Sequence, residues 1–149
     1  MILDSGNRRE YETGAVRDRQ KGKGRFDLVP IDVVAKLFVN DYVLLNIAAY
    51  WNDRDTQHLY DALSSFAPHA FGERETMMLE VAKHFEEGAE KYGENNWQKG
   101  LPVEDYLDSA LRHYFKWRRH DNDERHDRAF VWNIMCCCWE AEYHHGAEK

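Results

Sequence analysis

Apolar residues recur at helical spacing along most of this chain, and no core-like run alternates with a period of two. Between residues 32 and 51 they return every three or four positions, which is typical of one buried helix face. The same spacing predicts further helices over about 56–66, 73–92, 103–118 and 124–145. Pro68, Gly72 and Gly93 stand where the intervening turns are expected. We therefore predict an all-α fold, a bundle of four or five helices.

The length of 149 residues suits one domain with its own core and is too short for two ordinary domains. We expect a single domain over 1–149, in which the polar, glycine-containing residues 1–24 form an arm. The three cysteines, at 136–138, are adjacent, so on a helix they point in different directions and cannot form a disulfide framework. We expect buried thiols in a reducing cytosol.

Charge and hydropathy restrict the partners that the chain can have. With 20 basic and 27 acidic side chains the net charge is −7, whereas a general nucleic-acid footprint is usually basic. No apolar stretch is long enough to cross a bilayer, and the first 14 residues lack the basic and apolar regions of a secretory signal. We therefore expect no nucleic-acid polymer and no membrane as partner, and a cytoplasmic location.

Three glutamates lie at the edge of the apolar face of the helix predicted over 73–92. Taking Glu86 as the reference, Glu90 lies about 40° and Glu87 about 100° around the helix, beside the apolar residues. Like charges this close repel, and a divalent cation would remove the repulsion. The alternative is a solvated acidic face paired with Lys83 and Lys91.

The helix predicted over 103–118 repeats this arrangement. Asp105 and Asp108 border its apolar stripe, and Arg112 lies one turn after Asp108. The alternative is a surface ion pair between Asp108 and Arg112, which would add little stability.

The last predicted helix carries a polar line inside an apolar face. His126, Asn133 and Glu140 are seven residues apart, so they lie within about 20° of one another. Unpaired buried polar groups cost about 1–3 kcal/mol each, so these side chains need partners. Either each is satisfied locally, or they share a polar pocket with the acids of the two preceding helices. Three helices with polar groups at a core edge point to a metal site inside a bundle.

The N-terminal arm carries a basic residue at every second position. If the segment is extended, all these charges lie on one side, and Gly22 and Gly24 let the backbone approach an anion. Such a strip suits the phosphates of a metal–polyphosphate ligand, whereas the alternative is a disordered tail. The strip comprises Arg17, Arg19, Lys21, Lys23 and Arg25.

Four segments carry a family resemblance: GAVRDRQKGKGRFDLVP at 14–30, FEEGAEKYGENNWQKG at 85–100, YLDSALRH at 106–113 and ERHDRAFVWN at 124–133. In combination they resemble the bacteriophage MazG-like dATP/dGTP diphosphohydrolases of the MazZ type, within the all-α NTP pyrophosphatases. Some phages use such enzymes in making 2-aminoadenine DNA, which implies a location in the infected host cell. Residues 31–79 are longer than the family arrangement, so an inserted helical hairpin is expected at about 40–70.

The resemblance implies metal-dependent hydrolysis of a purine deoxynucleoside triphosphate, with two or three Mg²⁺ or Mn²⁺ ions. Its first acidic motif corresponds to Glu86, Glu87 and Glu90. Its second has three candidates, of which Asp108 with Asp105 is favoured. The other candidates are the pairs Glu124/Asp127 and Asp123/His126.

The resemblance also implies binding roles. In this reading, side chains from the arm and the helices offset the phosphate charge, Asn96 and Trp97 hold the nucleoside, and His126 and Asn133 support the metal site. The wider group implies a homo-oligomer, a dimer or tetramer. Rival readings are a phosphohydrolase built on His113, His126 and Asp127, or a non-enzymatic phage protein that binds a host partner. The expected phosphate contacts are Lys23, Arg25, Lys91, Arg112 and His113.

Overall fold

The computed structural model describes residue 3, residues 5–18 and residues 21–144, and within them it confirms the all-α prediction. A short antiparallel hairpin pairs β1 (Arg8–Glu10) with β2 (Val16–Asp18). The 3-10 turns η1 (Phe26–Leu28) and η2 (Asn96–Lys99) and the π-turn η3 (Glu140–His144) complete the elements. The described residues form six α-helices: α1 (Ile31–Leu37), α2 (Tyr42–Asp53), α3 (Gln57–Phe71), α4 (Arg74–Tyr92), α5 (Val103–Arg118) and α6 (His126–Trp139).

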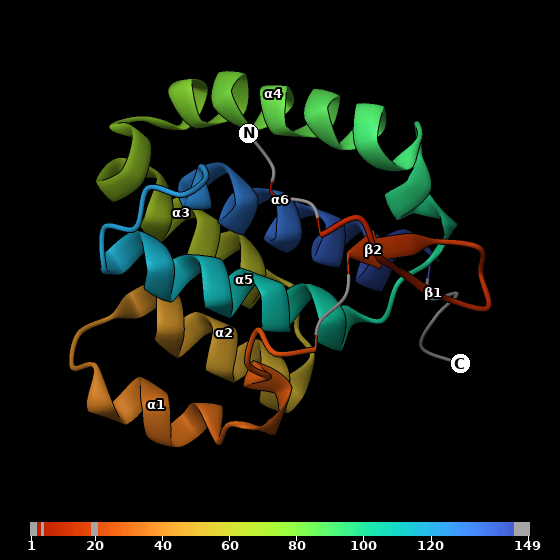
Figure 1. Ribbon diagram of the computed structural model, residues 1–149. Coiled ribbons are helices and arrows are strands. Elements are labelled where there is room, and N and C mark those ends of the chain that lie inside the picture. The colour runs from red at the N-terminus through yellow and green to blue at the C-terminus, as the bar shows by residue number, and fades with distance from the viewer. Residues whose placement is uncertain (1–2, 4, 19–20, 145–149) are drawn as a thin grey trace.

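The helices pack around the pair α5 and α6, which lie against each other at the centre of the molecule (Figure 1). On α5 the buried residues Leu107, Leu111 and Tyr114 follow the 3–4 spacing of an apolar helix face. Helix α4 packs against α6 and α3, and α3 in turn forms an antiparallel pair with α2. This pair occupies the segment where an inserted hairpin was expected.

Two predicted helices have almost the expected bounds. The spacing predicts helices over 73–92 and 103–118, and the structure has α4 at Arg74–Tyr92 and α5 at Val103–Arg118. Helix α4 ends where expected because Gly93, with a φ of 92°, takes a conformation that other residues adopt only with strain.

The helix expected over 32–51 is divided into α1 and α2, which corrects the sequence prediction. Asn40 has a φ of 62°, and Asp41 caps α2 by accepting a hydrogen bond from the Leu44 N–H at 3.0 Å. The other oxygen of Asp41 accepts from Tyr114 Oη at 2.7 Å and Arg118 Nη1 at 2.8 Å. Contacts with α5 therefore hold the break between the two helices.

Two other helix ends also differ from the prediction. Helix α3 runs through Pro68 to Phe71; Pro68 lacks the N–H that would pair with the Ser64 carbonyl, and both residues are exposed. Helix α6 begins at His126 and passes into the π-turn at Glu140, whose buried carboxylate accepts from Leu101 N–H at 3.0 Å. The predicted end at residue 145 lies outside the described residues.

The expected burial of the three thiols is confirmed, since Cys136, Cys137 and Cys138 are buried and unbridged on α6. Burial raises the pKa of the Cys138 thiol to about 12, so it is not a thiolate near neutral pH. No helix in the described part of the chain has the length and apolar character needed to traverse a bilayer.

Candidate active site

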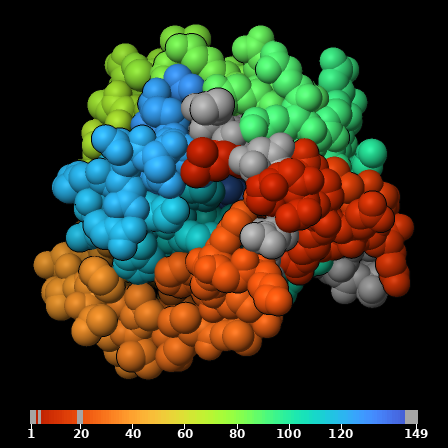
Figure 2. All heavy atoms as spheres, viewed as in Figure 1, coloured from red at the N-terminus to blue at the C-terminus, as the bar shows by residue number. Residues whose placement is uncertain are grey.

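A cavity of about 650 Å³ lies between α4, α5 and α6, beside the N-terminal arm. Figure 2 shows the arm, in red and orange, lying across the cyan and blue surface of α5 and α6. Helix α4 contributes His84, Gly88 and Tyr92, which are four residues apart and so share one face. The volume falls within the range of small-molecule sites. Cationic side chains surround it: Arg9, Arg17, Lys23, Arg112 and Lys116.

The arm is ordered by specific contacts with the bundle. The Asn96 side chain pairs with the backbone of Val16, accepting from its N–H and donating to its carbonyl, both at 2.8 Å. Thr13 Oγ1 donates to the carbonyl of Gly100 at 2.5 Å. Asn96 therefore lines the cavity, but its amide group holds the arm in place.

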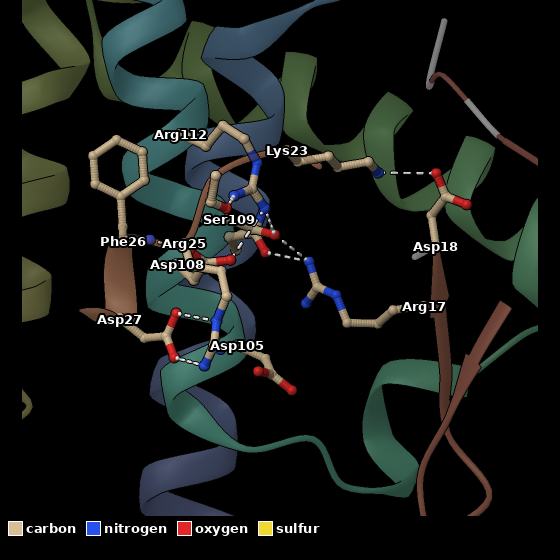
Figure 3. Close-up of polar contacts among 12 residues, drawn as sticks. Arg17, Asp18, Lys23, Arg25, Phe26, Asp27, Asp105, Asp108, Ser109 and Arg112 are labelled. Carbon is tan, nitrogen blue, oxygen red and sulfur yellow. Dashed lines mark hydrogen bonds and ion pairs between the residues drawn. The ribbon is translucent and has the colours of Figure 1, made fainter. Parts of the chain in front are cut away.

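Among the described residues the expected one-sided basic strip is not formed, because the chain is extended over Val16–Asp18 but turns at 21–23. Lys23 pairs with Asp18 at 3.0 Å, whereas Arg25 does not line the cavity and pairs with Asp27 at 2.6 Å (Figure 3). Lys21 is exposed, and Arg19 lies outside the described residues.

Arg17 extends from the arm to buried polar residues of α5 and α6. Its Nη2 donates to Ser109 Oγ at 2.8 Å and to Asn133 Oδ1 at 3.1 Å, while its Nη1 is buried without a hydrogen-bond partner (Figure 3). The guanidinium also lies over the rings of Tyr106 and Trp132. The sequence predicted Arg17 only as one of the basic residues of the arm and did not distinguish it from the others.

Asp108 is central to the attachment of the arm. Its side chain is 2% exposed, and it accepts from the Phe26 N–H at 2.5 Å and from Arg112 Nη2 at 3.2 Å (Figure 3). Arg112 Nη1 donates to the Gly24 carbonyl at 2.8 Å. The ion pair that was the alternative interpretation is thus present, but it is buried rather than at the surface, and it fixes the position of Arg112 at the cavity.

Asp105, one helical turn before Asp108, holds the hairpin. It accepts from Tyr11 Oη at 2.6 Å and pairs with Arg9 at 3.2 Å. Burial and the Asp105 carboxylate raise the pKa of the Tyr11 hydroxyl, which keeps Tyr11 a hydrogen-bond donor.

The glutamates of α4 lie beside the cavity, outside its lining. Glu86 and Glu90 are exposed and Glu87 is half-buried next to Gly88. Within the described residues, no group of three metal-ligand atoms lying within 4.8 Å of one another includes these glutamates or Asp108. The structure therefore does not bring the four expected carboxylates together within one chain, and their metal role stays a prediction.

Two other expected binding residues also lie off the cavity wall. Trp97 packs with its ring centroid 5.7 Å from that of Phe85 and 5.1 Å from that of Trp139, and Lys91 is half-buried on α4. The aromatic side chains that do line the cavity are Tyr92 and Trp132.

The histidines of α5 and α6 meet at the other end of the cavity. His113 Nδ1 lies 2.9 Å from His126 Nδ1, and His126 Nε2 lies 2.5 Å from Asp123 Oδ1. Burial lowers the pKa of His113 well below its ordinary value, and the nearby His126 and Arg112 lower it further. The hydrogen bond with His126 lowers the pKa of Asp123 to about 2.

Two groups of side chains near these histidines have the spacing of metal ligands: His113, Glu124 and His126, and Asp121, Asp123 and His126. Asp127 belongs to neither, because it pairs with Arg125 at 2.8 Å and accepts from the Arg128 N–H. The pairing of His113 with His126 joins residues 13 positions apart on two helices, which no single helical wheel shows.

The bundle defines an all-α protein whose cavity is lined by cationic side chains together with the carboxylates of Asp18, Asp105, Asp108 and Glu124. A sequence model described as the N-terminal region of dATP/dGTP diphosphohydrolases matches residues 68–149, which is more than half of the chain. The chain therefore belongs to the dATP/dGTP diphosphohydrolase family. Comparison with curated proteins and with solved structures gave no match.

Proposed function

We propose that this protein hydrolyses dATP and dGTP to dAMP and dGMP plus pyrophosphate, with a divalent metal ion. The family supports the reaction class. The observation that carries the substrate assignment is Arg17 Nη1, a buried guanidinium nitrogen without a partner beside a cavity of about 650 Å³. Leaving such a donor unpaired costs about 1–3 kcal/mol, and a phosphate oxygen would supply the missing acceptor.

The triphosphate would lie along the side of the cavity formed by α5 and the arm. Arg112 is held there by the Asp108 carboxylate and the Gly24 carbonyl, so its charge is positioned before substrate binds. Arg17, Lys23 and Lys116 add positive charge on the same cavity and would offset the charge that develops on the pyrophosphate.

The purine would lie against the aromatic wall, where Trp132 and Tyr92 line the cavity. Stacking on such rings is worth about 1–3 kcal/mol per base and does not select between purines. This assignment replaces the expected contact with Trp97, which packs between Phe85 and Trp139.

The predicted ions are Mg²⁺ or Mn²⁺, two or three in number. A bound divalent ion would neutralise phosphate charge and lower the pKa of a coordinated water. Glu86, Glu87, Glu90 and Asp108 do not cluster within one chain, so an ion bound by the glutamates would take its remaining ligands from elsewhere, such as a second copy of the chain.

We also propose a homo-oligomer, a dimer or tetramer, with α4 at an interface. Met78 and Leu79 are 48% and 71% exposed on the same helix as Glu86 and Glu90. A second copy packed there would bury apolar surface and bring further ligands toward these acids. Light scattering should give a mass above 17.7 kDa, and Leu79→Lys should lower it.

Phage purine deoxynucleotide metabolism, including the 2-aminoadenine DNA pathway, is the setting that the resemblance supports. A panel of all dNTPs and NTPs with Mg²⁺ and Mn²⁺, with both products resolved by chromatography, tests the activity. The proposal predicts pyrophosphate with dAMP and dGMP. The pairing of His113 with His126 favours one rival, a phosphohydrolase, which would release triphosphate or single phosphates. A nucleotide-independent binding protein would give no product and no thermal shift.

A further inference from the structure

We propose that His113, His126 and Glu124 form a binding site for one first-row transition-metal ion that prefers nitrogen ligands, such as Zn²⁺. Two imidazoles and one carboxylate are a ligand set of zinc sites that keep an open coordination position. This metal site rests on the proposed function in one respect only, which is that a phosphate oxygen of the nucleotide would occupy the open position.

The two imidazoles approach each other as ligands of a common ion would. Their Nδ1 atoms are 2.9 Å apart, on residues held by α5 and by the first turn of α6. With Zn–N bonds of about 2.0–2.1 Å, tetrahedral ligands are about 3.3 Å apart, so the rings need to separate by only about 0.4 Å. Without an ion, one hydrogen lies between the two Nδ1 atoms as a hydrogen bond. When that hydrogen moves to Nε2 of His113, both Nδ1 atoms are free to bind a metal ion.

Glu124 supplies the third ligand. Its carboxylate lies within 4.8 Å of the ligand atoms of both histidines and lines the cavity together with His113. Within the described residues it receives no side-chain hydrogen bond. A half-buried carboxylate without a donor beside two imidazoles favours a cation as partner.

Asp123 is placed as a positioning residue for this site. It lies 2.5 Å from His126 Nε2, on the ring edge opposite the Nδ1 that faces His113. Ligating histidines usually donate their other N–H to a carboxylate, which fixes the ring and its tautomer. Asp123 and His126 are three residues apart, at the start of α6, so local structure maintains the pair.

The position of the site gives it an open side. His113 and Glu124 line the cavity that also contains Arg17, whereas His126 is 2% exposed behind them. Three protein ligands leave at least one position free on a tetrahedral ion. That position would face the cavity, where a water or a phosphate oxygen can reach it.

Calorimetric titration of the chelator-treated full chain with ZnCl₂, and separately with MgCl₂, tests the proposal. We expect one Zn²⁺ per chain and much weaker Mg²⁺ binding. His113→Gln and Glu124→Gln should each weaken zinc binding at least 100-fold, and Asp123→Asn about 10–100-fold. His84→Gln, a cavity histidine outside the cluster, is the matched control and should bind zinc as the wild type does.

Cobalt provides a readout that does not depend on activity or stability. Co²⁺ bound to the wild type should give the strong visible absorption of a tetrahedral site, which is absent in folded Glu124→Gln. Equal zinc affinity in the wild type, His113→Gln and Glu124→Gln would overturn the proposal. A cobalt spectrum that shows only six-coordinate Co²⁺ would also overturn it. Because no nucleotide is added, zinc binding without dATP hydrolysis contradicts only the proposed function. Hydrolysis of dATP by a protein that does not bind zinc contradicts only the proposed zinc site.

Discussion

Arg17 Nη2 lies 3.1 Å from Asn133 Oδ1, and this hydrogen bond joins the N-terminal arm to the buried face of α6. Asn133 in turn donates to the Ala129 carbonyl at 2.8 Å, so its orientation is fixed from within its own helix. The guanidinium is thereby held at the cavity, and its other terminal nitrogen, Nη1, is buried without a hydrogen-bond partner.

Removal of this guanidinium should weaken substrate binding. Arg17→Ala is expected to raise KM for dATP about 10–100-fold, because a hydrogen bond to a charged group is worth about 1.5–3 kcal/mol. Arg17→Lys should recover part of the loss, since it keeps the charge without the planar fork. Lys21→Ala removes an exposed charge of the same arm and should leave KM unchanged. An unchanged KM in Arg17→Ala would refute the phosphate contact.

The glutamates of α4 are tested by isosteric substitutions that keep the fold. Glu87→Gln and Glu90→Gln should each lower kcat/KM for dATP at least 100-fold, because a lost metal ligand removes several kcal/mol of transition-state stabilisation. Glu75→Gln, an exposed glutamate in the first turn of the same helix, should hydrolyse dATP normally. If both Glu87→Gln and Glu90→Gln turn over dATP and dGTP at wild-type rates, the carboxylate assignment is wrong.

Asp108 and Asp127 are the alternative acids of the second motif, and the structure separates them. Asp108→Asn should destabilise the fold by about 3 kcal/mol, because it leaves the partly buried Arg112 without its anion. It should also lower kcat about 100-fold by misplacing Arg112. Asp127→Asn breaks a more exposed pair with Arg125 and should cost about 0–1 kcal/mol. Urea unfolding and steady-state kinetics measure both effects, and a loss confined to Asp127→Asn would reverse the choice.

His84 should make stability fall in acid. Burial lowers its pKa from 6.5 to about 4, so the unfolded chain binds a proton that the folded chain refuses between these values. The contribution of neutral His84 to the free energy of unfolding is complete above pH 6.5 and is lost as the pH falls toward 4. The loss amounts to roughly 2–3 kcal/mol by pH 4.5. Urea unfolding at pH 7 and 4.5 should show this loss reduced in His84→Gln but not in His69→Gln, an exposed control. Equal losses in all three proteins would contradict it.

Local periodicity was sufficient to predict the bounds of α5, because its apolar residues repeat without interruption and its ends carry turn residues. The break at Asn40–Asp41 was not predictable in this way. It depends on Asp41 meeting Tyr114 and Arg118, more than 70 residues away. A helical wheel shows the position of a residue on its own helix, but it does not show which side chains of a second helix contact that residue.

The same distinction applies to the candidate site. The wheel placed Asp108 at a core edge beside Arg112, and the structure shows that pair buried. The direction of Arg17 depends on how the hairpin docks through Asn96, and the pairing of His113 with His126 depends on how α5 and α6 pack.

The most direct test of the central claim is the position of the oxygen that water donates. Hydrolysis of dATP in H₂¹⁸O with Mg²⁺, followed by mass spectrometry of both products, locates the phosphorus that is attacked. The account predicts one ¹⁸O in dAMP and none in pyrophosphate, since water attacks the α-phosphorus. Label in pyrophosphate, or release of triphosphate or single phosphates in place of pyrophosphate, would contradict it.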